Sequence, residues 1–325
     1  MITVVIPTRN RATLLAQALS SLRQQALSRR SFEVVVVDNG STDATAAVIE
    51  AARQELGNLV GIHAPEPGLH TGRHAGLSAA TGEVLVFADD DIEALPTWLA
   101  SIKEAFEDPD VALVGGNNFP LFVQAPPAWL IKLWNKGSFR GYKALPALSV
   151  IEFAKAPASF SPYDVWGCNF AVRKDVLVAA GGFHPDAMPR ELIRFRGDGE
   201  THVSRYVARS AKKCVFHPGA SVHHKVTPDR MTFAYFRQRG FNQGVSESFT
   251  QLREGQDSRP TPAKSLPRAT LGWLWRHAIR LAENAEVRQA LDQLEAGRGE
   301  GFAFHQRAYR EDPEVRAWVH RPAYL

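Results

Sequence analysis

Cysteine is scarce in this chain, since Cys168 and Cys214 are the only two among 325 residues. Two cysteines argue against a disulfide framework and are typical of a protein that folds in a reducing cytoplasm. No run of about 18 apolar residues occurs, so no segment is predicted to span a bilayer, and no signal peptide precedes the first apolar run. The chain is predicted to be cytoplasmic.

An excess of one charge is also missing. The sequence has 38 Lys and Arg against 34 Asp and Glu. This mildly basic balance suits an anionic ligand and is far from the signature of a nucleic-acid-binding protein. The 45% hydrophobic content is enough for a substantial core.

The first hundred residues alternate apolar runs with polar turns and helical periodicity. Such alternation predicts an α/β fold with a mostly parallel sheet and helices on both faces. Strands are expected at 3–6, 32–37, 59–62 and 84–87, and helices over the Leu14 to Leu22 pattern and at 44–56 and 71–80.

Three consecutive carboxylates, Asp89, Asp90 and Asp91, follow the apolar run at 84–87. Side chains alternate along extended chain, so Asp89 and Asp91 are expected to point one way and Asp90 the other. Two carboxylates at the carboxyl end of a central strand suit a Mg²⁺ or Mn²⁺ ion that carries a pyrophosphate. An acidic solvated turn or a helix N-cap is the alternative.

Four stretches in this order resemble family 2 glycosyltransferases, which have the Rossmann-like GT-A fold and use nucleotide sugars. They are Val5 to Asn10, Val37 to Asp43, Asp89 to Asp91 after Gly82-Glu83, and Gly167 to Arg173 followed by Gly181-Gly182-Phe183 and Gly197 to Glu200. The resemblance covers about residues 3 to 225. It implies a divalent metal and a nucleoside-diphosphate-sugar donor, with UDP-sugar favoured over dTDP- and GDP-sugars.

On the donor side, the resemblance implies that Asp38 binds the nucleoside and that Arg73 faces the diphosphate. A turn-initiating role for Asp38 and a salt bridge for Arg73 are the alternatives. His74 stands where relatives have Asn, which puts the hydrogen bond of that Asn in doubt. The full donor-binding set is Pro7, Thr8, Arg9, Asp38, Arg73, Asp89 and Asp90.

On the acceptor side, Asp198 matches the aspartate that serves as catalytic base in the family. Relatives carry Glu before that base, and this chain has Gly197. Glu200 is therefore kept as the alternative base, and a third interpretation is that both acids complement a helix dipole. With Asp198 as base, the transfer is expected to invert the anomeric configuration.

Three further residues are candidates for the site. His223 and His224 follow a strand-like run, so only one is expected to face the metal; His224 is preferred to His223, and a structural role is an equal alternative for either. Trp166 and Asn169 are predicted to contact the acceptor. Core packing is an equal alternative for Trp166.

Residues 1–226 are expected to form the catalytic domain and 227–325 a mostly helical extension. Within the domain, we expect a nucleotide-sugar half at 1–116, an irregular insertion at 117–165 and an acceptor half at 166–226. The insertion is expected to shape the acceptor pocket, and an extension of the core is the alternative. A polar linker is expected at 253–267 and a helix at 271–294.

The basic and aromatic segment 266–281 allows peripheral contact with a membrane, packing against its own domain, or packing against a second subunit in a homodimer. The first choice favours a lipid-linked saccharide as acceptor, and the others a soluble glycan or small molecule.

Three functions are compatible with these observations. The leading one is an inverting, metal-dependent hexosyltransferase. The alternatives are a sugar nucleotidyltransferase, for which Pro7 to Asn10 is a poor phosphate-binding loop, and a catalytically silent GT-A binding protein.

Overall fold

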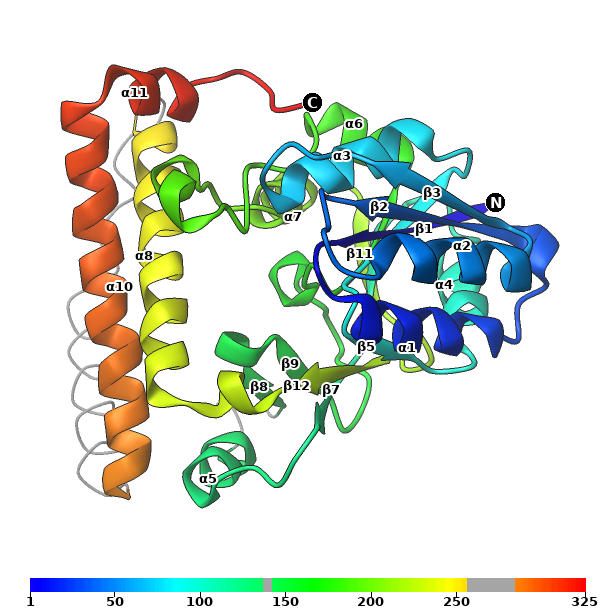
Figure 1. Ribbon diagram of the computed structural model, residues 1–325, viewed down its shortest axis with the longest axis horizontal. Helices are drawn as coiled ribbons and strands as arrows, with labels where there is room; N and C mark the ends of the chain where they lie inside the picture. Colours follow the sequence, from blue (N-terminus) through cyan, green and yellow to red (C-terminus); the bar gives the residue numbers. More distant parts are fainter. Residues whose placement is uncertain (137–141, 256–283) are drawn as a thin grey trace.

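The computed structural model describes residues 1–136, 142–255 and 284–325 (Figure 1). A seven-stranded mixed sheet forms the centre of the first two-thirds of the chain, in the order β11-β6-β10-β4-β1-β2-β3. Strands β1 to β4 and the β6–β11 pair are parallel, whereas β10 runs antiparallel to both of its neighbours. The α/β fold expected from the alternating pattern is confirmed.

The five inner strands of this sheet are almost entirely buried because both of its faces are covered there, whereas the edge strands β3 and β11 are more exposed. The strands of the sheet span β1 Ile2–Thr8, β2 Phe32–Asp38, β3 Leu59–His63, β4 Val84–Ala88, β6 Val111–Gly115, β10 Asn169–Arg173 and β11 Lys213–Phe216.

Two core clusters lie on opposite faces of the sheet. Val4 and Val34 point to the face covered by α1 (Ala12–Arg23), α2 (Thr45–Leu56) and α4 (Trp98–Ala105). Val5 and Val35 point to the face covered by α3 (Leu69–Ala79), α6 (Lys174–Ala179) and α7 (Thr201–Arg209). The period of two along each strand therefore builds both cores.

A second sheet of five short strands, in the order β5-β12-β7-β9-β8, lies beyond the end of β4. Its strands are β5 Ile92–Ala94, β7 Asn118–Phe122, β8 Lys143–Leu145, β9 Val150–Glu152 and β12 Val222–Val226. Three of them come from residues 117–165, together with α5 (Ala128–Asn135). Trp129 and Trp134 of α5 are buried in a core shared with α8 and α10.

Two long helices, α8 (Phe233–Glu254) and α10 (Ala285–Glu311), pack side by side, and α11 (Pro313–Val319) follows (Figure 1). Their contact is made through glycines. A Cβ on Gly240 or Gly244 of α8 would lie 2.0 Å from a carbonyl oxygen of α10, and one on Gly297 or Gly301 would lie 2.0 Å from a carbonyl oxygen of α8. The two backbones thus touch directly.

The helical C-terminal region is confirmed. Short 3-10 turns connect the larger elements, at 29–31, 146–148, 162–164, 190–195 and 228–231. The linker at 253–267 and the basic segment at 266–281 lie mostly or wholly outside the described residues, as does the first part of the helix expected at 271–294. Within the described ranges, no helix is both long and apolar enough to cross a membrane.

Candidate active site

The three aspartates after β4 have different surroundings. Asp90 is buried and accepts hydrogen bonds from Thr8 Oγ1 at 2.7 Å and from Arg11 at 2.5 Å. Asp89 is half-buried and lines a cavity of about 1460 Å³. Asp91 is buried and faces His224. Burial raises the pKa of Asp90 to about 6, although the guanidinium of Arg11 opposes this shift.

A hydrogen bond to a backbone carbonyl selects one tautomer of His224. Its Nδ1 lies 3.0 Å from the carbonyl oxygen of Leu148, which can only accept, so Nδ1 carries the proton. Its Nε2 lies 3.1 Å from Asp91 Oδ1, yet neither atom has a hydrogen-bond partner. Two buried acceptor atoms that face each other repel, so this contact is favourable only with a cation or a proton between them.

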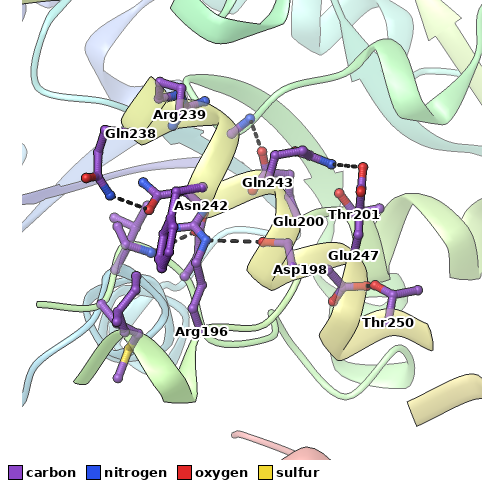
Figure 2. Close-up of a pocket in the computed structure, with 18 of the residues that line it drawn as sticks. Arg196, Asp198, Glu200, Thr201, Gln238, Arg239, Asn242, Gln243, Glu247 and Thr250 are labelled. Carbon is purple, nitrogen blue, oxygen red and sulfur yellow. Dashed lines mark hydrogen bonds and ion pairs between the residues drawn. The ribbon is translucent and has the colours of Figure 1, made fainter. Parts of the chain in front are cut away.

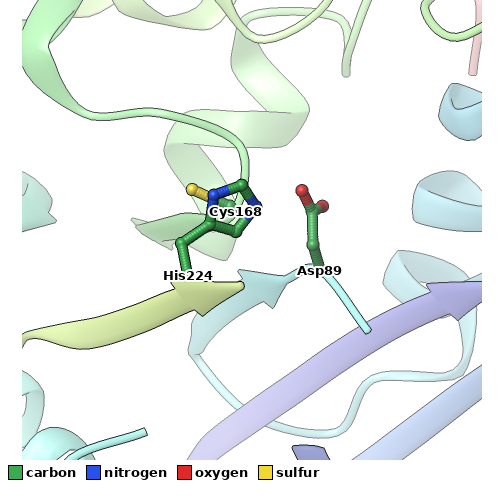
Figure 3. Close-up of side chains that lie close together, drawn as sticks. All are labelled: Asp89, Cys168 and His224. Atoms are coloured by element: carbon green, nitrogen blue, oxygen red, sulfur yellow. The ribbon is translucent and has the colours of Figure 1, made fainter. Parts of the chain in front are cut away.

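These atoms fit a divalent metal. Ligand atoms of Asp89, Cys168 and His224 lie within 4.8 Å of one another (Figure 3). Carboxylate oxygens and a neutral imidazole suit Mn²⁺ or Mg²⁺, whereas the Cys168 thiol is a softer group. The bond from His224 to Leu148 is the kind of outer contact that orients a metal-binding histidine. His223 points elsewhere and packs on Phe119, with ring centroids 5.5 Å apart.

Two arginines that sequence reasoning missed contact Asp91. Arg11 lies 3.3 Å and Arg230 lies 3.1 Å from Asp91 Oδ2. Burial alone would raise the pKa of Asp91, but His224 and the two guanidinium groups hold it below its ordinary value. Arg230 also lines the cavity. Arg11 is adjacent to the Thr8 to Asn10 loop, and this was the one available signal for it; Arg230 stands in no motif.

The residues of the expected nucleoside side lie at the ends of β1 and β2. Thr8 pairs with Asp38 in the sheet register. Asp38 is buried, and its Oδ1 accepts a hydrogen bond from the backbone of Ser41 at 2.8 Å. Pro7 is buried and Arg9 is exposed. None of these four residues lines the 1460 Å³ cavity.

Arg73 projects from α3 into the cavity wall. Its side chain is almost fully buried, lies 3.3 Å from Glu200 Oε2 and stacks over Phe183 at 5.0 Å. The neighbouring His74 accepts a hydrogen bond at Nε2 from the backbone of Phe183 at 2.9 Å. A histidine at 74 therefore supplies a link from α3 to the nearby loop.

Glu200 faces the cavity at the start of α7. Its Oε1 accepts a hydrogen bond from the backbone of Gly167 at 3.1 Å, and 23% of its side chain remains exposed. Asp89 and Glu200 line the same cavity. We call Asp89, Asp91, Glu200 and His224 the cavity cluster: Asp89 and Glu200 line the cavity, His224 lies within 4.8 Å of Asp89, and Asp91 faces His224.

Asp198 also lines the cavity, but its side chain is only 4% exposed. Its oxygens accept hydrogen bonds from His184 Nδ1 at 2.5 Å, Arg205 at 2.9 Å and Thr250 Oγ1 at 2.8 Å. Asp198 and Thr250 are labelled in Figure 2. Burial would raise its pKa, but these partners, above all His184, hold it well below the ordinary value. We call His184, Asp198, Arg205 and Thr250 the buried charge cluster.

Trp166 and Asn169 lie in the structural surroundings of the site. Trp166 is half-buried against the core and donates through Nε1 to the carbonyl of Tyr163. Asn169 is buried, accepts from Trp98 Nε1 and donates to Asn118 and to the carbonyl of Ala220. Neither side chain lines the cavity.

A comparison with protein-family models identifies the family of this chain. The model described as glycosyl transferase family 2 matches residues 3–177, which is more than half of the chain. The chain belongs to glycosyltransferase family 2. The family identified from the four motifs is confirmed, and with it the assignment as a glycosyltransferase.

Curated relatives are moderately similar. Validoxylamine A glucosyltransferase of Streptomyces hygroscopicus subsp. jinggangensis is 34% identical over 201 residues, 57% of this chain and 47% of the relative. Succinoglycan biosynthesis protein ExoM of Rhizobium meliloti is 24% identical over 268 residues, 77% of each chain. Glycosyltransferase AglE of Haloferax volcanii is 31% identical over 117 residues, 36% of this chain and 38% of the relative. The matches to validoxylamine A glucosyltransferase and AglE thus span less than half of those relatives.

Solved structures share the fold. The mannosyltransferase PcManGT from Pyrobaculum calidifontis, in complex with GDP-Man and Mn2+, has a TM-score of 0.56 and 22% identity, and the match covers 98% of this chain and 82% of that one. TarS 1-349 of S. aureus has a TM-score of 0.51 and 16% identity, and the match covers 95% of this chain and 91% of that one. These likenesses show a GT-A fold.

Proposed function

We propose that this chain is an inverting, divalent-metal-dependent glycosyltransferase that moves a sugar from a UDP-sugar to a hydroxyl of a glycan, a lipid-linked saccharide or a small molecule. The observation that carries the proposal is the cavity cluster. In it, Asp89 at the end of β4, which lies close to His224, shares one cavity with the partly exposed carboxylate of Glu200. The GDP-Man and Mn2+ in the complex of PcManGT support a nucleotide-sugar donor and a metal.

Asp89, Asp91 and His224 would hold the metal. Support comes from the two unpartnered atoms, Asp91 Oδ1 and His224 Nε2, and from the approach of Asp89 to His224. A bound Mn²⁺ or Mg²⁺ supplies charge stabilisation for the leaving diphosphate. Arg73 and Arg230, which line the same cavity, add fixed positive charge toward that group.

Glu200 is proposed as the base that takes the acceptor proton, with Asp198 in a supporting role. A base needs a free oxygen within reach of the acceptor hydroxyl. Glu200 keeps part of its carboxylate exposed in the cavity. Asp198 accepts three hydrogen bonds and pairs with Arg205 at 2.9 Å, so taking a proton would break this ion pair. The pair of Glu200 with Arg73 is longer, at 3.3 Å.

Asp38 is proposed to bind the nucleoside, with Pro7, Thr8 and Arg9 beside it at the ends of β1 and β2. Asp38 Oδ2 has one described polar neighbour, His63 at 3.8 Å, so this oxygen remains able to accept a hydrogen bond from a base or a ribose. Asp90 supports this loop through Thr8 and Arg11.

A panel of UDP-, GDP- and dTDP-sugars, with and without Mn²⁺, tests the proposal. Release of nucleoside diphosphate that requires the metal is the expected result, with UDP-sugars fastest. Proton NMR of the product should show an inverted anomeric configuration. Release of pyrophosphate, retention of configuration, or full activity in excess chelator would contradict it.

A further inference from the structure

The cavity extends well beyond the cavity cluster. Its volume of about 1460 Å³ exceeds the range of roughly 300 to 1,000 Å³ typical of small-molecule sites. The nucleoside-side residues Pro7, Thr8, Arg9 and Asp38 are not part of its wall, whereas much of α8 is. Most of this space therefore lies on the acceptor side.

The face of α8 toward the cavity is a long polar surface. Positions three and four residues apart lie on one face of a helix, so the lining residues form two adjacent ridges. From Gln238 to Thr250 they extend about 18 Å at 1.5 Å per residue. They are Gln238, Arg239, Asn242, Gln243, Ser246, Glu247, Thr250, Gln251 and Glu254, several of which are labelled in Figure 2.

The two halves of this face have different partners. In the second half, Ser246 donates to the carbonyl of Gly197 and Thr250 donates to Asp198, so these side chains hold the 197–198 loop. In the first half, Gln238 donates to Asn242 at 3.0 Å and Gln243 donates to Glu247 at 3.1 Å. Each amide offers two N–H donors and two acceptor lone pairs, so one such bond leaves hydrogen-bonding capacity directed at the cavity.

The charges of the wall favour a neutral ligand. The lining residues include seven arginines and seven Asp or Glu side chains, so the two charges balance. Three of these arginines form ion pairs within the wall, Arg196 with Asp186, Arg205 with Asp198 and Arg73 with Glu200. The half-buried rings of Phe241 and Phe304, whose centroids lie 5.4 Å apart, add an apolar surface to the same cavity. Amides and carboxylates beside aromatic rings match the alternating hydroxyl and C–H surfaces of a sugar.

From these observations we infer that the first half of α8, at Gln238, Asn242 and Gln243, binds the distal sugars of an oligosaccharide acceptor. This inference rests on the proposed function and specifies its acceptor. A single hexose is about as long as one helical turn of 5.4 Å, so a ligand that reaches from Glu200 along this face needs two or more sugars. A neutral oligosaccharide is thus favoured over a free monosaccharide.

Saturation-transfer NMR tests the inference without turnover. The probes are linear gluco-, manno-, galacto- and N-acetylglucosamine oligosaccharides of one to five units. At least one series should bind more tightly as it lengthens from one to three units. In the double variant Gln238→Ala, Asn242→Ala, affinity for the trisaccharide should fall about three- to tenfold, as expected for lost hydrogen bonds, while monosaccharide binding should not change.

Gln293→Ala is the matched control, since Gln293 is an amide on α10 that pairs with Arg237 and does not line the cavity. It should leave the length dependence intact. Equal affinity for all lengths, or an unchanged trisaccharide affinity in the double variant, would overturn the inference. Donor chemistry is measured separately, by metal-dependent hydrolysis of the nucleotide sugar without acceptor, so a failure of the proposed function is recognised independently.

Discussion

The buried charge cluster and the cavity cluster contain carboxylates only two residues apart, Asp198 and Glu200, yet the two groups have opposite surroundings. Asp198 has three donors and a side chain that is 4% exposed, whereas Glu200 accepts one hydrogen bond from the backbone of Gly167 and one from Arg73 at 3.3 Å and is 23% exposed. A motif position therefore does not by itself identify a base. The number of hydrogen bonds already accepted by each oxygen separates a structural acid from one that can take a proton.

The largest expected effect is on the cavity cluster. Asp91→Ala should reduce turnover to near background, because the site loses the carboxylate that faces His224. Turnover with Mn²⁺ is the measurement, and circular dichroism checks the fold. Asp110→Ala, which removes an exposed carboxylate outside the cavity, serves as the control. An Asp91→Ala enzyme with normal turnover would place the metal elsewhere.

The next prediction compares the stability of a variant in the buried charge cluster with that of a variant in the cavity cluster. Asp198→Asn removes the charge that compensates Arg205. Breaking a buried ion pair in this way should lower the free energy of unfolding by about 3 kcal/mol or more. Denaturant unfolding should show this loss. Glu200→Gln should lose far less, because its side chain is partly solvated. Equal losses in the two variants would remove the distinction between the clusters.

The pH dependence of stability in the Asp198→Asn variant gives a further test of the buried charge cluster. The folded-state pKa of Asp198 lies below its unfolded value, so its stabilisation is present above the unfolded pKa of about 3.9 and is lost as pH falls below it. The stability gap between wild type and Asp198→Asn should be constant near neutral pH and shrink below about pH 4. A gap that shrinks near pH 6 would point to His184 instead.

Catalysis provides the third contrast. Glu200→Gln keeps the shape of the side chain but cannot take a proton, so kcat should fall by roughly two orders of magnitude, with little change in donor affinity. The folded fraction of Asp198→Asn should keep more activity. The reverse ranking of kcat would return the role of base to Asp198.

The smallest effect is expected on the nucleoside side. Asp38→Ala should raise the donor KM by about three- to tenfold, as for one lost hydrogen bond, and leave kcat nearly unchanged. Calorimetry with the nucleoside diphosphate measures the affinity directly. An unchanged dissociation constant would assign Asp38 to the turn at Ser41.

The parallel strands and covering helices could be predicted because each depends on local periodicity. The expected strands at 3–6, 32–37 and 84–87 lie within β1, β2 and β4. The surroundings of Asp198 could not be predicted, since Thr250 is 52 residues further along the chain and belongs to a helix with no recognised motif. Arg230 meets Asp91 across 139 residues for the same reason.

The glycine contact between α8 and α10 limits where α8, which lines the proposed acceptor cavity, can lie. With two backbones touching, α8 cannot retreat toward α10, and any side chain larger than hydrogen at Gly240 or Gly297 would push it the other way, into the cavity. Specificity can then change through substitutions on the polar face of α8 while the wall stays in place. Because four glycines place the two helices in direct contact, we expect the position of α8 to limit the size of the acceptor that fits.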